Sequence, residues 1–586
     1  MLRNRRVIAA ASLFLILLVC LVLRLIQIQL ISPESFSRHH VNLIAESVNQ
    51  RMQSITLDDG RGKLYDRAGT PIDHQPVPAL ILFPFLSKMA WPIEKVTAIL
   101  GIESVEIQKQ LDSAKSPFVF QRNGKPFSLT DSQMDELNKL KIPGVFAAVR
   151  FIPVNNGIAR QMLGGLTMSK EIKEDRYGDR QLAANVKVGD KGLQEQLDEF
   201  LLSDGETKLV YHVDGMGGPL FGVNIKYLAP GNPLYPVKVR TTLDMDIQKA
   251  AEEAVDENGI KSGGLILIDI DSSEIRASVS RPSLSEGSDP NKGDGAKNRM
   301  VQQATLGSVF KTVVSAAALE EGEVNDTMVF DCNQTIKGSP EQERPLGLLN
   351  FTESFARSCN RTFGDLAVAV TKKNPDSLQT YAEKLQLIGK SGWTGDIYHS
   401  PVTQLYGEES GRIWINGENR KDANLVSQTG IGQQDVQATP LGAANMMATI
   451  ARGGKRKEVK AVSSIDFSNG TTAALFKDHD IHGGEISPVT AKKLQMLLEQ
   501  VVEDPNGTAA LLSALPFKVA GKTGTAQTNK EQRLLNMWFA GYFPADHPKY
   551  AIAAVRLNAH SEEKSATRLV GDFLQKLSQE EELTGE

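Results

Sequence analysis

The segment VAGKTGTAQT, residues 519–528, is compatible with two different folds. Its Gly521-Lys522-Thr523 matches the end of a phosphate-binding loop, and it also matches a strand that lines the pocket of a serine acyltransferase. A phosphate-binding loop requires a glycine five residues before that triplet, so that successive N–H groups face the phosphates. Pro516 occupies this position and has no N–H to donate. We therefore interpret the segment as a strand, which predicts that other parts of the chain supply partners for a pocket.

A serine and a lysine at the start of a predicted helix are the first partners. The stretch GSVFKTVVSAAALEEG, residues 307–322, places Ser308 and Lys311 three positions apart, so their side chains share one helix face. Where no histidine serves it, a serine nucleophile can give its proton to a lysine that burial or a nearby positive charge keeps neutral. Serine and lysine are common, so the pair alone equally fits a chance arrangement on a helix surface.

Two further segments carry polar groups that suit such a site. In FARSCNRTF, the Ser358 hydroxyl can pass a proton between base and leaving group, and the Asn360 amide can hold a peptide substrate. In the predicted strand, Lys522 can bind an anionic group and keep a neighbouring amine neutral. Gly524 allows a substrate backbone to approach closely, and the N–H of Thr525 can face an oxyanion.

The elements around these motifs predict an α+β fold. Residues 241–255 have the pattern of an amphipathic helix with Asp244 as its N-cap. Two strand hairpins are expected, which consist of residues 263–270 with 274–280 and residues 537–545 with 550–558. Helical segments lie between the two hairpins, which favours an antiparallel sheet assembled from both ends of the domain and packed with helices.

The N-terminus predicts a membrane anchor. Arg3, Arg5 and Arg6 precede an uncharged run of 17 residues, 7–23, and the apolar stretch continues after Arg24. This length is sufficient to span a bilayer as a helix. A cleaved signal peptide is the alternative, but no small-residue cleavage site follows the run. The arginines favour a cytoplasmic N-terminus and a chain that otherwise lies outside.

Composition narrows the class of protein. The chain has 586 residues, 41% of them hydrophobic and 23% charged, which is typical of two or three globular domains. A net charge of -5 does not favour a nucleic-acid partner. The sequence has no metal-ligand spacing, so neither a metal nor another cofactor is expected. Cys20 lies in the predicted anchor, and Cys332 and Cys359 can form one disulfide or remain two free thiols.

The three short motifs in this order are those of penicillin-binding proteins and serine β-lactamases. From about residue 60 onward, the chain resembles the class B penicillin-binding proteins, the monofunctional peptidoglycan transpeptidases. The resemblance extends to RGKLYDRAG, VRTTLDMDIQKAA, ATPLGAANMMATIARGG, DPNGTA and MWFAGYFPA. Two positions depart from the family pattern: Leu306 stands where a proline is usual, and Gln194 stands where a glutamate is usual, which is expected to weaken contacts in the N-terminal region.

The resemblance implies a domain organisation. It comprises a cytoplasmic N-terminus at 1–6, a transmembrane helix at 7–31, an elongated pedestal or dimerisation-like domain at 33–235, a penicillin-binding transpeptidase domain with a serine β-lactamase-like fold at 236–575, and an acidic tail at 576–586.

The resemblance also implies a reaction. Ser308 is expected to attack the carbonyl of a D-Ala-D-Ala stem peptide, with Lys311 as proton acceptor. Ser358 is expected to relay the proton to the departing D-alanine, and Asn360 to orient the substrate amide. An amine of a second stem peptide then resolves the acyl-enzyme and forms a cross-link, with D,D-carboxypeptidase activity as a side reaction. β-Lactams are expected to acylate the same serine.

The remaining site residues are expected to bind the substrate. Lys522, Thr523 and Thr525 hold the terminal carboxylate, and Gly524 admits the substrate backbone. The backbone N–H groups of Ser308 and Thr525 form the oxyanion hole. The membrane and a glycan polymerase are the expected partners, besides the peptidoglycan stem peptides themselves.

Other functions for the same pocket are less consistent with the sequence. A class A β-lactamase uses a glutamate between the second and third motifs, and LIGKSGWTGDIYHS, about 35 residues after Ser358, contains none. A β-lactam sensor would need a signalling domain or several membrane segments. A scaffold with an idle pocket would not need the full set of catalytic groups. The sequence leaves open whether the protein serves elongation, division, sporulation or an accessory role.

Overall fold

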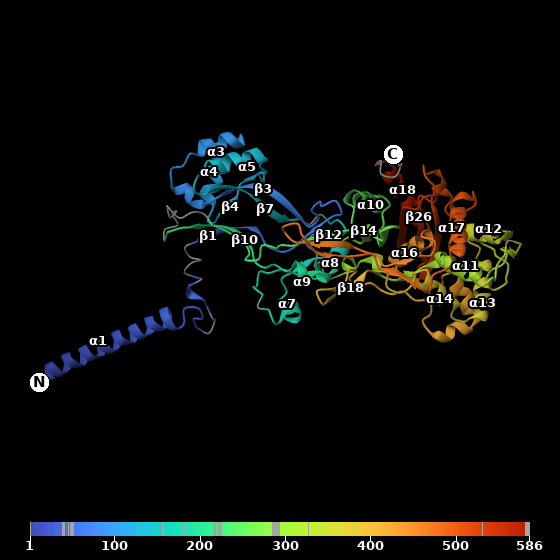
Figure 1. Ribbon diagram of the computed structural model, residues 1–586, viewed down its shortest axis with the longest axis horizontal. Helices are drawn as coiled ribbons and strands as arrows, with labels where there is room; N and C mark the ends of the chain where they lie inside the picture. Colours follow the sequence, from blue (N-terminus) through green and yellow to red (C-terminus); the bar gives the residue numbers. More distant parts are fainter. Residues whose placement is uncertain are drawn as a thin grey trace. The chain divides into compact units, whose positions relative to one another are not determined.

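The structure is a computed structural model of the whole chain, in which two compact units are formed. It describes residues 2–37, 41–44, 46, 52–154, 157–180, 182–214, 218, 226–283, 293–325, 327–529 and 531–579. The first unit consists of Met1–Arg61, His74–Pro153 and Ser203–Asn232, and the second of Gly62–Asp73, Val154–Leu202 and Pro233–Glu586 (Figure 1). Two stretches of the predicted pedestal region, Gly62–Asp73 and Val154–Leu202, therefore pack with the C-terminal part of the chain.

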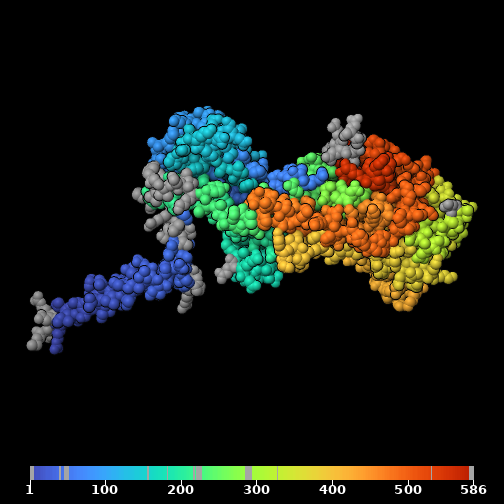
Figure 2. All heavy atoms as spheres, in the orientation of Figure 1, coloured from blue at the N-terminus to red at the C-terminus, as the bar shows by residue number. Residues whose placement is uncertain are grey.

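The N-terminal segment is one continuous apolar helix. The α-helix α1, Leu2–Ile26, passes directly into a π-helical turn, Gln27–Ile31. The 27 residues Arg5–Ile31 have a mean hydropathy of 2.8 in their most apolar window and are exposed along their length (Figure 2). The expected apolar helix is confirmed, and among the described residues it is the one helix long and apolar enough to cross a bilayer.

The rest of the first unit contains two three-stranded sheets, a short hairpin and several helices. Strands β3, His74–Leu82, and β7, Val145–Pro153, pair antiparallel, and β1, Met52–Asp58, pairs with β10, Thr207–His212. The helices are α3, Ile93–Leu100, α4, Ser104–Ser113, and α5, Asp131–Lys139. A separate core of buried aliphatic and aromatic side chains fills this unit, with Phe83, Phe85 and Tyr211 in mutual ring contact.

A five-stranded antiparallel sheet forms the centre of the second unit. Its order is β14-β13-β27-β26-β25, so the two ends of the domain meet at the pairing of β13 with β27. The strands are β13, Gly263–Asp269, β14, Ile275–Arg281, β25, Ala520–Asn529, β26, Leu534–Phe543, and β27, Tyr550–Ala559. Both predicted hairpins and the predicted α+β class are confirmed.

Helices cover the sheet. Helix α10, Met245–Glu257, and helix α18, Ala566–Gln579, pack against each other and on the sheet, and α16, Pro440–Ala451, packs on β13, β26 and β27 (Figure 1). As predicted, Asp244 caps α10 and accepts bonds from the N–H groups of Asp246 and Ile247. Residues 576–579 of the predicted acidic tail continue α18, and 580–586 lie outside the described residues.

Strand β25 is an edge strand. It pairs with β26 on one side only, so one row of its backbone N–H and C=O groups has no sheet partner within the described part of the chain. Small residues let its neighbours approach closely, since a Cβ on Gly521 would lie 2.4 Å from the Phe539 ring. Helix α17, Pro488–Glu503, packs against the strand. An edge strand in this place can pair with an extended peptide.

Gln194 makes a specific contact in the second unit. Its side chain is buried, and its Nε2 donates to Asp73 Oδ2 at 3.0 Å. An ionised glutamate would instead place a second carboxylate against Asp73. The glutamine at this position thus supplies one contact, and its weakening effect relative to a glutamate stays a prediction.

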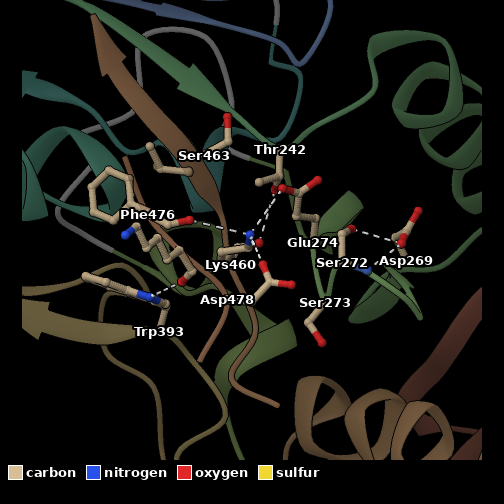
Figure 3. A network of polar contacts seen from close by, with 12 residues as sticks. Thr242, Asp269, Ser272, Ser273, Glu274, Trp393, Lys460, Ser463, Phe476 and Asp478 are labelled. Atoms are coloured by element: carbon tan, nitrogen blue, oxygen red, sulfur yellow. Dashed lines mark hydrogen bonds and ion pairs between the residues drawn. The ribbon is translucent and has the colours of Figure 1, made fainter. Parts of the chain in front are cut away.

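A polar network joins the β13–β14 turn to Lys460 and Asp478, which lie far from it in the chain (Figure 3). The Nζ of Lys460 lies 3.4 Å from Glu274 Oε1 and forms a second ion pair with Asp478. Arg276 pairs with the same Glu274 at 2.7 Å and with Asp269 at 3.1 Å. The side chains of Lys460 and Arg276 are each only 7% exposed, so the network depends on both charges being compensated.

We predict that Lys460→Met lowers the free energy of unfolding by about 2 kcal/mol, because the largely buried Glu274 and the partly exposed Asp478 lose a cation. Urea denaturation of the detergent-solubilised chain measures the change. Lys170→Met is the matched control: Lys170 is 86% exposed in its pair with Glu174, and its loss is expected to cost at most about 0.5 kcal/mol. Equal unfolding midpoints for the two variants would contradict a stabilising role of the network.

Candidate active site

Ser308 lies in a 3-10 turn that leads into a helix. The turn is Gly307–Phe310, and α11 begins at Lys311 and ends at Glu320. The predicted helix is thus confirmed, but its first residues are wound more tightly than an α-helix. In a 3-10 turn, residues three apart lie directly above one another, which brings Ser308 and Lys311 to the same side.

Glycines allow three backbone segments to meet at this turn. Gly307 has φ +64°, and its N–H donates to the Gly432 carbonyl at 2.9 Å. A Cβ on Gly307 would lie 2.5 Å from the Thr525 oxygen and 2.9 Å from its nitrogen. A Cβ on Gly524 would lie 2.6 Å from the Leu306 oxygen. The backbone before Ser308 therefore lies directly against β25, and only glycine fits at these contacts.

The amine of Lys311 is buried among polar atoms of the second motif. The side chain has 0% exposure, and its Nζ lies 3.0 Å from the Ser358 hydroxyl, 2.8 Å from the Ser358 carbonyl oxygen and 2.8 Å from Asn360 Oδ1. Burial lowers the pKa of Lys311 well below its ordinary value, and the charges of Lys522 and Arg344 lower it further. The site therefore favours a neutral amine at this position.

Ser358 occupies the turn between two helices, α12, Phe351–Ala356, and α13, Asn360–Lys373. Its φ of +59° is in the left-handed region, which is uncommon for a residue other than glycine. The next residue, Cys359, donates its N–H to the Ser354 carbonyl at 2.8 Å and forms a disulfide with Cys332. The sequence left open whether Cys332 and Cys359 are bonded or free, and the structure contains the disulfide.

Lys522 is the second buried lysine of the site. Its side chain has 0% exposure, and its Nζ lies 3.2 Å from the Thr523 carbonyl oxygen. Burial, followed by the charge of Arg344, lowers the pKa of Lys522 to about 7. The Nζ also lies 5.7 Å from the centre of the Phe355 ring. The corresponding distance from Lys311 to the Phe363 ring is 5.5 Å, and these two buried rings contact each other edge to face.

Six of the eight predicted residues line one cavity of about 620 Å³ in the second unit. They are Ser308, Ser358, Asn360, Thr523, Gly524 and Thr525. The other two, Lys311 and Lys522, are buried beside it and reach it through the contacts given above. A cavity of this size suits a small molecule or a short peptide. Within the described residues, no group of three or more His, Cys, Asp or Glu side chains could hold a metal ion.

Three polar residues of the site were not predicted from the sequence. The guanidinium of Arg344 donates to the Ser358 carbonyl at 3.1 Å and lines the cavity. The hydroxyl of Thr508 accepts a hydrogen bond from Thr523 at 2.7 Å, and the Gln433 amide donates to the Thr525 carbonyl at 3.2 Å. DPNGTA, which contains Thr508, was among the stretches that resemble the family, whereas nothing in the pattern around Arg344 or Gln433 indicated a role.

Comparison with known proteins matches this site and its sheet to one family. A family model described as "Penicillin binding protein transpeptidase domain" matches residues 263–575, which is more than half of the chain. The peptidoglycan D,D-transpeptidase PbpA of Mycobacterium tuberculosis is 26% identical over 388 residues, covering 58% of this chain and 72% of that protein.

Two further relatives extend over nearly the whole chain. The peptidoglycan D,D-transpeptidase MrdA of Acinetobacter baumannii is 23% identical and covers 94% of this chain and 84% of its own. The peptidoglycan D,D-transpeptidase FtsI of Escherichia coli is 21% identical and covers 91% of this chain and 84% of its own. The similarity is therefore not confined to the second unit.

Solved structures share the fold. A chain of a peptidoglycan synthase complex has a TM-score of 0.63 at 23% identity, with 97% of both chains covered. Penicillin-binding protein 2B of Streptococcus pneumoniae has a TM-score of 0.57 at 16% identity, covering 91% of this chain and 100% of its own. With the family match and the named relatives, these findings establish the family. The chain belongs to the penicillin-binding protein transpeptidases, and it is a class B penicillin-binding protein with peptidoglycan D,D-transpeptidase activity.

Proposed function

We propose that Ser308 is the nucleophile of the transpeptidase and Lys311 its general base. The Ser308 hydroxyl attacks the carbonyl carbon of the penultimate D-alanine and gives its proton to the Lys311 amine. The bond to the terminal D-alanine breaks, and the Ser358 hydroxyl passes a proton to the departing amine. The observation that carries the proposal is the fully buried Lys311 amine, held within 3.0 Å of Ser358 and Asn360.

The edge of β25 binds the substrate in this proposal. An extended stem peptide pairs with the free backbone groups of the strand, while Lys522, Thr523 and Thr525 hold its terminal carboxylate. Gly524 lines the cavity, and its missing Cβ makes room for the backbone before Ser308. The N–H groups of Ser308 and Thr525 bind the oxyanion of the tetrahedral intermediate. The close approach of Gly307 to the Thr525 backbone supports this pairing of donors.

The second half of the reaction transfers the acyl group to an amine. The amine of a neighbouring stem peptide attacks the ester carbonyl and gives a proton to the Lys311 amine. Lys311 passes this proton to the Ser308 oxygen as the ester bond breaks. The product is a peptide cross-link. A β-lactam is attacked in the same way, but its leaving group stays attached and the serine remains acylated.

The cavity lies outside the cytoplasm in this proposal. The apolar helix anchors the chain once in the membrane, with Arg3, Arg5 and Arg6 on the cytoplasmic side. The Cys332–Cys359 disulfide is consistent with an oxidising compartment. A glycan polymerase is the proposed partner, since a similar chain occurs in a solved structure titled a peptidoglycan synthase complex.

We predict that a fluorescent penicillin forms a stable adduct with the full-length chain and none with Ser308→Ala. The adduct should persist for hours, because the segment LIGKSGWTGDIYHS lacks the glutamate with which class A β-lactamases activate water. Gel fluorescence after addition of unlabelled penicillin measures its lifetime. Absence of a Ser308-dependent adduct would exclude the pocket assignment, and release within seconds would indicate a β-lactamase.

We predict that Lys522→Ala slows acylation by about 100-fold or more, because the substrate carboxylate loses its buried counter-charge. Lys518→Ala is the matched control, since Lys518 is 62% exposed and pairs with Glu503 on the surface. Thermal melting shows whether each variant is folded. Normal labelling of a folded Lys522→Ala protein would count against the assigned role.

The pKa values of the two lysines predict a bell-shaped pH profile for the second-order acylation rate constant. Acylation requires Lys311 neutral, so the rate falls as the pH drops through the lowered pKa of Lys311. It requires Lys522 charged, so the rate also falls as the pH rises above about 7. Lys522→Arg should abolish the basic limb, because a guanidinium stays protonated. A wild-type acylation rate that keeps rising as the pH increases above about 7 would contradict the need for a charged Lys522.

A further inference from the structure

Arg344 brings an uncompensated positive charge to the cavity. It lies in the loop 332–347, between β16, Val329–Asp331, and β17, Leu348–Asn350. Its guanidinium donates to the Ser358 carbonyl at 3.1 Å. Among the described residues, no carboxylate forms an ion pair with it, although Glu341 and Glu343 on the same loop also line the cavity. The charge therefore acts on the groups around Ser358.

The loop is fastened at its base to the second catalytic motif. Cys332 begins the loop, and its disulfide partner Cys359 lies between Ser358 and Asn360 in the chain. The N–H of Cys332 donates to the Gly347 carbonyl at 2.9 Å, which closes the loop on itself. Both sulfur atoms are buried in a small cluster with Leu349. The disulfide thus joins the loop that carries Arg344 to the turn that carries Ser358.

Ser358 needs such support because its backbone is in the left-handed region. This conformation directs both its hydroxyl and its carbonyl oxygen toward Lys311, whose Nζ lies 3.0 and 2.8 Å away. The same carbonyl oxygen accepts the bond from Arg344. Two positively charged or polar donors therefore converge on one oxygen and hold the turn in place.

We infer that Arg344 is a positioning residue for acylation, and that the Cys332–Cys359 disulfide keeps it in place. Arg344 holds the Ser358 carbonyl toward Lys311, and its charge disfavours a proton on the Lys311 amine. The inference rests on the proposed function of Ser308 and Lys311. The disulfide acts through the loop, although both of its cysteines also line the cavity.

The charges near Lys311 support this role. Lys522 reaches it from β25 and Arg344 from the loop, and both lower its pKa after burial. Across the cavity, Glu563 is paired with Arg556, and on α13 Arg361 is paired with Asp365. Loss of Arg344 should therefore raise the pKa of Lys311.

The first test compares Arg344→Gln, Arg344→Lys and the control Arg420→Gln in the detergent-solubilised full-length chain. Arg420 pairs with Asp376 on the surface and does not line the cavity. Acylation by fluorescent penicillin is followed from pH 5 to 9 at several penicillin concentrations. Arg344→Gln should slow the saturating acylation rate about tenfold, the size of one charge-assisted hydrogen bond, and move the acidic limb to higher pH. Arg344→Lys should restore the position of that limb.

Two outcomes would overturn the role of Arg344. One is an unchanged saturating rate and acidic limb with weaker penicillin affinity alone, which would indicate a contact with the ligand carboxylate. The other is a rate equal to that of Arg420→Gln at every pH. Ser308→Ala in parallel separates this result from a failure of the proposed function, in which even the wild type would form no Ser308-dependent adduct.

The second test asks whether the disulfide acts through Arg344. The double variant Cys332→Ser/Cys359→Ser should slow acylation and move the acidic limb in the same direction as Arg344→Gln. Adding Arg344→Gln to it should change the rate less than twofold, because coupled positions are not additive. Full additivity would contradict the coupling. If the double variant does not fold, reduction of the folded wild type and of Arg344→Gln with a phosphine, with thiols counted, gives the same comparison.

Discussion

The proposed site depends on a buried lysine amine, Lys311, whose pKa the protein lowers well below its ordinary value. A charged ammonium buried without a carboxylate is costly, so burial alone favours the neutral form of Lys311. The fold strengthens this effect by placing a second lysine and an arginine nearby, and by surrounding the amine with acceptors that tolerate a neutral group. Within the described residues, no carboxylate forms an ion pair with Lys311, which is consistent with its proposed role as a base in place of a histidine.

The sheet makes this burial possible. Glycine and alanine in β25, β26 and β27 allow helices and the 3-10 turn to pack closely on the sheet. The Phe363 and Phe355 rings contact each other and lie against the amines of Lys311 and Lys522. In the described part of the chain, the outer edge of β25 has no strand partner, and Thr523 and Thr525 of this strand line the cavity. The same strand therefore supplies one wall of the lysine site and one backbone edge for a peptide.

Sequence patterns correctly predicted the helices and strands that depend on neighbouring residues in the chain. The apolar run at 537–545, the capped helix after Asp244 and the N-terminal helix are confirmed at nearly the expected bounds. The positions of the eight site residues followed from three short motifs, and the structure brings them together at one cavity. Their chemical roles remain predictions for the experiments above.

The features that the sequence did not predict depend on contacts between residues that are far apart in the chain. Gly62–Asp73 and Val154–Leu202 pack with the C-terminal unit through tertiary contacts that no local period encodes. The 3-10 turn at Ser308 follows from the close approach of Gly307 to Gly432 and β25. Arg344 lies in an irregular stretch, and only the disulfide and the Ser358 carbonyl bring it to the site.

The most direct test of the account is a titration of the Lys311 amine itself. In protein labelled with ¹⁵N-lysine, the Lys311 signal is assigned by its loss in Lys311→Arg and followed with pH. We predict that this amine loses its proton at a pH well below 10.5, the ordinary pKa of a lysine. An Lys311 amine that titrates together with the exposed lysines would contradict its role as the base for Ser308.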